Sequence, residues 1–419
     1  MTRASPFDKR YVREQKRSAI LAEAAALFNV HGARATRLSD VAARLNLNQS
    51  SLYYYVDSKD DLIFQTYLAS CACLDRMLER AEREAATGAA RIGGFVRAYF
   101  EAWQAVARGE RPHFAILTEI RGLRPPHRAA VARRYLDLFQ RVRGYVEQGA
   151  RDGSLRPGDS LDLAVAVFGL VQMVVLWLGK IEPADYGKAA DAFVDILFNG
   201  IAANAGPLDD SAAVATRAGA PSAWPQPPAE KPQAFCAVGS DCFNRKGFRG
   251  ASLDEIAEQL DVSKGSFYHH VRDKDDLLRQ CFRRSLDLIA SALSRAGQGS
   301  GSGLQKLWAC AWQLFAVQNS SAGPLIRFNL IPSLAPRHQE EIRADIADVS
   351  ERLGDLIREG IGDGSIRPVD VLVAEHMLLT GIDLSADLRQ VRPTGDPAAA
   401  FRSYFGFYFR GLADRPRPV

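Results

Sequence analysis

The sequence predicts an all-α protein made of two tandem copies of one unit, each a three-helix helix-turn-helix domain followed by an antiparallel helical bundle. Two observations support this. Residues 27–62 and 242–277 align without a gap at a constant offset of 215, pairing Phe28 with Phe243 and Lys59 with Lys274. Elsewhere apolar residues recur with helical period up to residue 203 and again from 275 to 413. A repeat of this length predicts a duplicated domain.

A second block repeats near the end of each copy. ARDGSLRP (150–157) matches IGDGSIRP (361–368) at an offset of 211, and FNGI (198–201) matches FRGL (409–412). Both copies therefore keep the same order of parts. We expect five regions: a basic arm and first helix-turn-helix domain (1–63), a first effector and dimerisation domain (64–204), a Pro/Ala-rich linker (205–231), a second helix-turn-helix domain (232–278) and a second effector and dimerisation domain (279–414).

Composition excludes several classes of protein. The net charge of +4 is too small to indicate a polyanionic partner by itself, so the position of the basic residues has to decide. The six cysteines show no CxxC spacing and no histidine at ligand spacing, so we expect no metal, no cofactor and no disulfide framework. No phosphate loop, GxSxG or HExxH motif occurs, which argues against an enzyme.

The longest apolar run covers residues 163–178. Gly169 and Gln172 interrupt it, and it is short for a membrane span. No charged and then apolar leader opens the sequence. We therefore expect a cytoplasmic protein without a membrane partner.

Each repeated N-terminal block predicts three helices. The first ends at Gly32, which can take the left-handed position after a helix. The second opens in the second copy with Ser252 and Glu255 in capping-box register. The first copy has Arg37 where that serine stands, so we expect Thr36 to cap its helix.

A three-residue turn leads to the third helix, expected at 49–56 and 264–271. Leu52 and Phe267 anchor it to the core, and its small polar start can enter a DNA major groove and reach base edges.

The pattern LF…G…IA…L.V..S..YY, followed by KDDL, resembles the tetracycline-repressor (TetR) family. The resemblance implies that the start of the third helix reads bases, that its aromatic pair grips phosphates and that the following lysine contacts the backbone. Carried over by position, the DNA-binding candidates of the first copy are Gln49, Ser50, Ser51 and Tyr53 on bases and Tyr54, Tyr55 and Lys59 on phosphates. Those of the second copy are Lys264, Gly265, Ser266 and Tyr268, then His269, His270 and Lys274. We add Arg37 and Ser252 at the start of the second helices.

Alternatives remain for these residues. Tyr53 and Tyr268 could pack on the helix surface, although three consecutive aromatic residues cannot all face one core. His269 and His270 point about 100° apart on a helix and have no third ligand nearby, which argues against a metal site.

A basic arm precedes the first unit alone. Its residues are Arg3, Lys9, Arg10, Arg13, Lys16 and Arg17, against Asp8 and Glu14. Such an arm can follow phosphates or enter the minor groove, and a solvated tail would look similar. Because the second copy lacks an arm, we expect the two units to bind DNA unequally.

The last helices of the first copy, 161–179 and 189–201, resemble the pair that builds a four-helix dimer interface in the family. Residues 161–201 can pair with 370–412 inside one chain, giving an intramolecular pseudo-dimer. Two chains pairing copy with copy would instead give a homodimer with four DNA-binding units. The internal arrangement is favoured because the linker raises the effective concentration of the second half to roughly millimolar.

The first effector domain resembles a branch of the family that senses acyl-CoA thioesters. Candidate ligand-binding residues are Phe100, Trp103, Phe114, Arg121, Arg124, Phe139, Met173 and Trp177. The alternative for each aromatic residue is an ordinary place in the bundle core. The second copy loses the tryptophan, which predicts a degenerate pocket there.

Together these patterns predict a DNA-binding regulator, and the resemblance implies a repressor that binds double-stranded operator DNA and is released by a small effector, an acyl-CoA or another hydrophobic acid. The competing hypothesis is a ligand-independent DNA-binding scaffold in which one half has decayed. An enzyme ranks third.

Overall fold

The computed structural model describes residues 9–204, 230–386, 388 and 396–414. Over these residues helices are joined by turns and loops, with a single isolated β-bridge between Ala202 and Ile366 and no strand. The all-α prediction is confirmed. Arg3 and nearly all of the expected linker lie outside the described residues.

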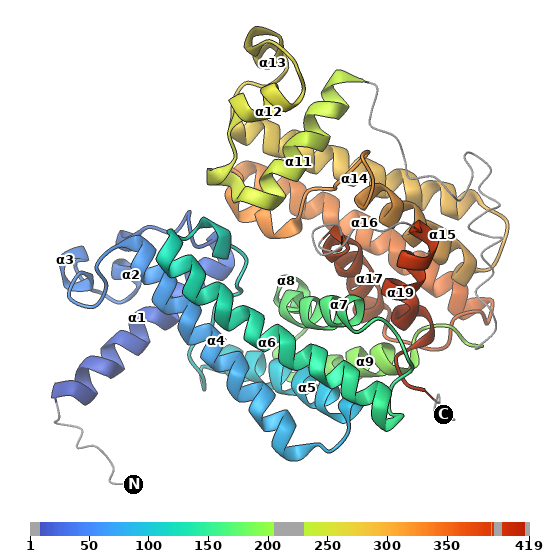
Figure 1. Ribbon diagram of the computed structural model, residues 1–419, viewed down its shortest axis with the longest axis horizontal. Helices are drawn as coiled ribbons and strands as arrows, with labels where there is room; N and C mark the ends of the chain where they lie inside the picture. The colour runs from blue at the N-terminus through green and yellow to red at the C-terminus, as the bar shows by residue number, and fades with distance from the viewer. Residues whose placement is uncertain (1–8, 205–229, 387, 389–395, 415–419) are drawn as a thin grey trace.

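The first half, residues 9–204, runs from the blue to the green end of the ribbon in Figure 1. Its helices are α1 (Lys9–His31), α2 (Leu38–Arg44), α3 (Gln49–Leu52), α4 (Lys59–Glu84), α5 (Gly88–Ala107), α6 (Pro125–Asp152), α7 (Ser160–Met173), α8 (Val175–Leu178) and α9 (Tyr186–Asn199), with 3-10 turns η1 (Ile120–Gly122) and η2 (Pro183–Asp185).

The second half, residues 230–414, repeats this order. Its helices are α11 (Lys231–Gly250), α12 (Leu253–Gln259), α13 (Lys264–His270), α14 (Lys274–Gln298), α15 (Gly303–Gln318), α16 (Pro336–Gly362), α17 (Val371–Leu384) and α19 (Pro397–Arg410), with a 3-10 turn η3 (Phe328–Ser333). In each half a long first helix and two short ones stand at one end of a bundle of long helices (Figure 1).

The turn before each third helix uses the same backbone device. Asn46 and Asp261 take positive φ angles of 53° and 51°. Asn and Asp tolerate this left-handed conformation better than other residues with a side chain. Asn48 and Ser263 then cap α3 and α13. The tight turn therefore follows from residues that the repeat places at equivalent positions.

Three local expectations were wrong. The third helix of the first half ends at Leu52 instead of residue 56, because the chain tightens there and the Tyr55 N–H donates to the Leu52 carbonyl at 2.8 Å. Thr36 does not cap α2. Its hydroxyl donates to the Gly32 carbonyl, and the Asp40 carboxylate accepts from the Arg37 N–H instead.

The third correction concerns the apolar stretch expected as one helix over 161–179. It divides at Val174 into α7 and α8. Ser160–Leu178 is the one stretch of the described residues that is long and apolar enough to cross a membrane, but 67% of it is buried inside the molecule. This burial is typical of a core helix.

The two halves meet through their last helices. α7 and α9 of the first half both pack against α17 and α19 of the second. Figure 1 shows this as green helices lying against red ones at the centre of the molecule. Phe193, Leu197 and Tyr408 of this face are almost wholly buried, and the Ser403 hydroxyl of α19 donates to the buried Asp162 carboxylate of α7 at 2.6 Å.

The repeated FNGI and FRGL segments bond to each other reciprocally across this contact. The Ile201 N–H donates to the Tyr408 carbonyl at 3.1 Å, and the Leu412 N–H donates to the Leu197 carbonyl at 2.9 Å. At the offset of 211, each of these bonds is the equivalent of the other.

The repeated GSLRP and GSIRP segments do the same. The Arg156 N–H donates to the Leu412 carbonyl at 2.8 Å, and the Arg367 N–H donates to the Ile201 carbonyl at 2.9 Å. The contact between the halves thus has the pattern of a two-fold interface, in which one patch meets its own copy.

Candidate nucleic-acid interface and effector cavities

The exposed start of α3 is held in place by its own turn. Leu52 and Val56 are buried and fix the helix on the core. The Asn48 side chain accepts hydrogen bonds from the Ser51 N–H at 2.9 Å and from the Ser50 hydroxyl at 2.8 Å. Gln49 and Ser50 are exposed. The polar residues predicted to reach bases therefore lie on one ordered, accessible surface.

Exposed tyrosines continue this surface. Tyr53 is 50% exposed and Tyr54 is 70% exposed, whereas Tyr55 is half-buried against the core. The Arg13 guanidinium of α1 lies over the Tyr54 ring, 5.2 Å from its centroid. A cation stacked on an exposed aromatic ring is a suitable contact for a phosphate backbone.

Lys59 stands at the start of α4, behind this surface. Its ammonium group donates to the Arg34 carbonyl. Burial, with the neighbouring charges of Arg249 and Arg34, lowers the pKa of Lys59 to about 8. The side chain therefore stays largely protonated at neutral pH but titrates within the range where DNA binding is measured.

In the second unit, side chains of the third helix, α13, form hydrogen bonds to one carboxylate on α12. Phe267 on the inner face of α13 and Val271 directly after this helix are buried in the core. On the outer face, the Lys264 ammonium donates to Asp254 Oδ2 at 2.7 Å, and the Tyr268 hydroxyl donates to Asp254 Oδ1 at 3.3 Å. The hydrogen bond from Lys264 holds the pKa of the Asp254 carboxyl below its usual value.

The remaining candidates of the second unit lie around this contact. Gly265, His269 and His270 are exposed. Lys274 is half-buried and donates to the Arg249 carbonyl at 3.4 Å, the counterpart of the bond that Lys59 makes. The other members of the predicted set are Arg37, exposed before α2, Ser252, whose hydroxyl accepts from the Glu255 N–H at 3.5 Å, and Ser266, whose N–H donates to the Ser263 hydroxyl at 3.2 Å.

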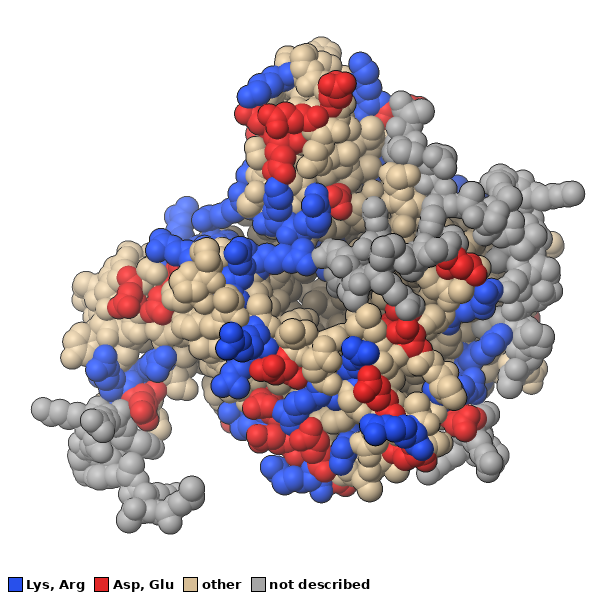
Figure 2. Space-filling view, in the orientation of Figure 1, with Lys and Arg blue, Asp and Glu red and all other residues tan. Residues whose placement is uncertain are grey.

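The two recognition surfaces differ in charge. Between Arg34 and Lys59 the first unit has four basic and two acidic residues, while the equivalent residues 249–274 have four basic and five acidic ones. Figure 2 shows acidic side chains gathered over the α12 region at the top of the molecule.

An asparagine joins each DNA-binding unit to its bundle. Asn29 Nδ2 donates to the Phe114 carbonyl at 2.9 Å, and Asn29 Oδ1 accepts from the Ile116 N–H at 2.9 Å. Asn244 forms the same two bonds with Leu325 and Arg327, at 2.8 and 3.1 Å. We call each of these contacts an asparagine bridge. Sequence reasoning missed it, although the repeated FN dipeptide carried the signal.

A second joint connects the start of α4 to the start of α6. The Asp60 carboxylate accepts from Arg34 at 3.1 Å and pairs with His127 at 2.6 Å. Asp275 and His338 form the equivalent pair at 3.0 Å. Burial raises the pKa of Asp60, but the hydrogen bonds from His127, the Arg124 N–H and Arg34 outweigh it, so the pKa lies below its usual value.

A cavity of about 730 Å³ lies where α6 and α7 face the second half, and we call it the large cavity. Phe139, Phe168 and Met173 give it an apolar wall. Its charged lining is Arg121, Arg128 and Arg327, with the Asp383 carboxylate paired to Arg327 at 3.8 Å. This volume and lining suit a small apolar ligand with an acidic group.

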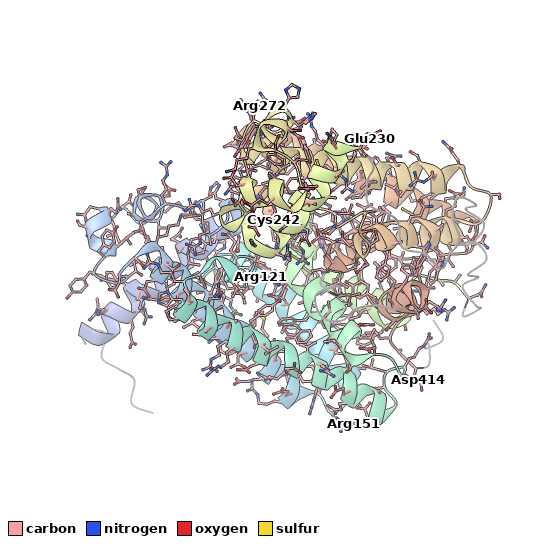
Figure 3. All side chains as sticks on the ribbon, turned by 45° about the horizontal axis from the view of Figure 1, so that its top comes forward. Arg121, Arg151, Glu230, Cys242, Arg272 and Asp414 are labelled. Atoms are coloured by element: carbon pink, nitrogen blue, oxygen red, sulfur yellow. The ribbon has the colours of Figure 1, made fainter. Side chains whose placement is uncertain are left out.

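The large cavity reaches the second DNA-binding unit, because Asn244 of α11 also lines it. Arg121 Nη1 donates to the Arg245 carbonyl on α11 at 3.1 Å. In Figure 3, Arg121 lies beside α11, which carries Cys242, and Arg272 marks the far end of that unit.

A cavity of about 300 Å³, the small cavity, occupies the equivalent place in the second half. Ile346 and Leu379 stand there at the positions of Tyr135 and Phe168. Pro332 takes the place of Arg121. The two cavities are therefore equivalent in position but differ in size, and only the large one has an arginine at the Arg121 position.

The predicted ligand-binding residues separate into three groups. Arg121, Phe139 and Met173 line the large cavity, and Trp177 lines the small one. Phe100, Trp103 and Phe114 are buried in the bundle, with the rings of Trp103 and Phe114 4.5 Å apart. Arg124 is exposed at the start of α6.

The described residues contain no group of three or more His, Cys, Asp or Glu side chains that could hold a metal ion. All six cysteines are buried free thiols.

The fold and the exposed third helices define a helix-turn-helix DNA-binding regulator. Residues 20–66 and 237–281 each match the family model of bacterial regulatory proteins of the tetR family, and residues 85–201 match the tetracyclin repressor-like C-terminal domain. The chain belongs to the TetR family of transcription regulators and is a tandem duplicated member of it.

Curated relatives each match about a third of this chain. The HTH-type transcriptional repressor KstR2 of Mycolicibacterium smegmatis is 23% identical over 146 residues, which is 34% of this chain and 71% of that protein. The HTH-type transcriptional regulator HbdR of Aromatoleum sp. (strain CIB) is 25% identical over 149 residues, 34% of this chain and 62% of that protein.

Similar solved structures include the TetR family transcriptional regulator PfmR from Thermus thermophilus, 24% identical with a TM-score of 0.36, covering 42% of this chain and 95% of that one. AibR in complex with isovaleryl coenzyme A and operator DNA is 22% identical with a TM-score of 0.36, covering 43% of this chain and 97% of that one.

Proposed function

We propose that one chain acts as an intramolecular pseudo-dimer that represses transcription by binding operator DNA in the cytoplasm and is released by a small hydrophobic acid. The reciprocal bonding of the repeated FNGI and FRGL segments is the observation that carries this proposal. A two-fold interface between identical chains would need the same patch on each. Here the two patches belong to one chain and are already paired.

The glycines at this contact favour a close and specific fit. Gly200 and Gly411 have φ angles of 68° and 77°. A Cβ atom on Gly411 would collide with the carbonyl oxygen of Phe198, and one on Gly200 would collide with that of Phe409. A four-headed homodimer would require both segments to leave their present partners and find the same partners on a second chain.

DNA binding is assigned to the first unit above all. Gln49, Ser50 and Tyr53 form an exposed polar surface, and Arg13 and Tyr54 lie beside it. The test is binding of the full chain to duplexes selected from a randomised pool. We expect Gln49→Ala to reduce affinity about tenfold or more, because a good base contact contributes about 1–3 kcal/mol. An unchanged affinity would contradict the assignment.

The large cavity is the proposed effector site. Its apolar wall would hold an acyl chain, and Arg121 would hold an acidic group. Arg121 lies two residues after Glu119, whose carboxylate accepts from the Arg34 N–H of the first DNA-binding unit at 3.2 Å. A ligand that engages Arg121 would therefore disturb the joint between that unit and its bundle, together with the bond from Arg121 to the α11 backbone.

A release assay tests this site. A panel of acyl-CoA thioesters and free carboxylic acids is titrated into the protein–duplex complex. We expect Arg121→Gln to raise the ligand concentration needed for release about tenfold or more, on the scale of a lost charged contact. The matched control Arg124→Gln, on the exposed start of α6, should leave release unchanged. Equal effects of both variants would overturn the assignment.

A further inference from the structure

Asp254 lies on α12, next to the recognition helix of the second unit. Its two carboxylate oxygens accept hydrogen bonds from Lys264 at 2.7 Å and from Tyr268 at 3.3 Å. Lys264 and Tyr268 occupy the positions of Gln49 and Tyr53, which are the outward-facing residues of the first recognition helix. One carboxylate therefore holds two of the predicted DNA-contacting side chains of this helix, Lys264 and Tyr268.

The first unit has no acid at the position equivalent to Asp254. Ser39 stands where the second unit has Asp254. Its hydroxyl donates to Asp40, and Gln49 donates to the Tyr53 hydroxyl at 3.5 Å. The outward-facing residues of α3 are thus bonded to each other and carry no ionic partner on α2.

The Asp254 contact contributes little to the fold. The side chains of Lys264 and Asp254 are 64% and 47% exposed, and an ion pair in that setting is weak because water and salt screen it. Bound DNA would add an unfavourable interaction at Asp254. A bound duplex would bring phosphates against the Asp254 carboxylate, and like charges at close range are repulsive. Lys264 would have to leave a carboxylate in order to reach a base or phosphate.

Neighbouring charges act in the same direction. Glu258 and Asp261 stand on or after α12 in the second unit, where the first unit has Ala43 and Asn46, whereas Glu255 has an acidic counterpart and is paired with Lys246. Binding to a polyanion depends on releasing the counterions that basic side chains replace. A surface with more acids than bases gains little from that release.

We propose that Asp254 blocks DNA reading by the second recognition helix, so that the chain reads one half-site, through its first unit. This inference rests on the proposed function, and it assigns to Asp254 the choice between one half-site and two. The second unit then serves as a structural partner that completes the pseudo-dimer.

The test uses Asp254→Ser in the full chain, which introduces the residue of the first unit. Wild-type and variant proteins each select duplexes from a randomised pool. We expect wild type to enrich one motif and D254S to enrich the same motif plus a second one at a fixed spacing. For the two-motif duplex we expect D254S to bind about tenfold more tightly, with a log K against log salt slope steeper by about 0.9 for one added phosphate contact.

A second variant separates the Asp254 contact from charge alone. Asp261→Asn removes one acid from the same surface, and Asn is the residue that the first unit carries in this left-handed turn. We expect D261N to select one motif, as wild type does. Thermal unfolding of D254S should match that of wild type, because the ion pair is exposed.

Three outcomes would overturn the inference: two equally strong motifs selected by wild type, a second motif selected by D261N as well, or no second motif for D254S. The effect of Gln49→Ala distinguishes this failure from failure of the proposed function. If Q49A loses DNA binding while D254S changes nothing, only the role of Asp254 fails. If Q49A binds as wild type does, the proposed function fails as well.

Discussion

The two helix-turn-helix units have the same interior and different exteriors. Leu52 and Phe267 are both fully buried at equivalent positions, and both units are joined to their bundles by an asparagine bridge. On the outside, Gln49 faces Tyr53 in one unit, and Lys264 faces Asp254 in the other. After duplication within one chain, the packing that forms a unit and the joint that holds it are alike in both copies, while the exposed surface of the third helix has diverged.

The two cavities likewise share a position but differ in their lining. Both lie at equivalent places between the halves, yet Arg121 of the large cavity has Pro332 as its counterpart in the small one. Differences that would be impossible in a homodimer are open to a fused chain, since each half can change without changing the other.

We expect the largest effect from a substitution that disrupts the contact between the two halves. Gly411→Val places a branched side chain at positive φ against the Phe198 carbonyl. We expect about 3 kcal/mol or more of lost unfolding free energy, from backbone strain and overpacking together. Urea unfolding measures this. Gly406→Ala on the preceding helix α19, where an added Cβ meets nothing within 4 Å, should cost nothing. Equal effects would mean that the contact between the halves is not needed for stability.

Paired substitutions test the recognition surfaces directly. Gln49→Ala with Tyr53→Ala should reduce affinity for a selected duplex by about a hundredfold, because two base contacts are lost at about 1–3 kcal/mol each. Lys264→Ala with Tyr268→Ala should change it less than about threefold. Fluorescence anisotropy at one fixed salt concentration makes the comparison. Similar losses from both pairs would show that the units bind DNA equally.

The two asparagine bridges should contribute equally to stability, although the outer surfaces of the two units differ. Asn29→Ala and Asn244→Ala each remove two hydrogen bonds to partly buried backbone groups, so we expect each to lower the unfolding free energy by about 2 kcal/mol. Chemical unfolding of the two variants provides the check. A loss confined to one of them would mean that the joints have diverged as well.

Lys59 predicts a pH dependence of DNA binding. Its folded pKa of about 8 lies below the ordinary value, and the protonated form is the one that binds phosphate. Affinity should therefore be constant below about pH 7 and fall as pH rises through 8, by up to about tenfold at pH 9. Lys59→Arg should flatten this fall, because Arg stays charged, while Lys274→Arg should not. A flat wild-type profile would exclude Lys59 from the interface.

The sequence predicted the architecture because a repeat with helical period constrains it strongly. It also predicted the exposed surface of α3 from the polar run that begins at Gln49. Other features needed both halves at once: the large cavity forms only where Phe139 and Met173 meet Asn244 of the other half. Arg121 and Arg124 were equivalent candidates in the sequence, and only the fold separates the residue in the cavity from the residue outside it.

Some features could have been predicted and were not. A position-by-position comparison of the copies pairs Ser39 with Asp254, ten residues before Lys264, and the intervening turn brings the two together. The end of α3 at Leu52 could not be predicted, because the matching stretch of the second half stays helical up to His270.

The proposed pseudo-dimer requires one chain to do the work of two. The mass of the protein in solution, measured by native mass spectrometry with and without a selected duplex, tests this most directly. We expect a single chain of 46.0 kDa when free and one chain per duplex when bound. Two chains per duplex, or a free species of twice that mass, would contradict the pseudo-dimer and favour a four-headed homodimer.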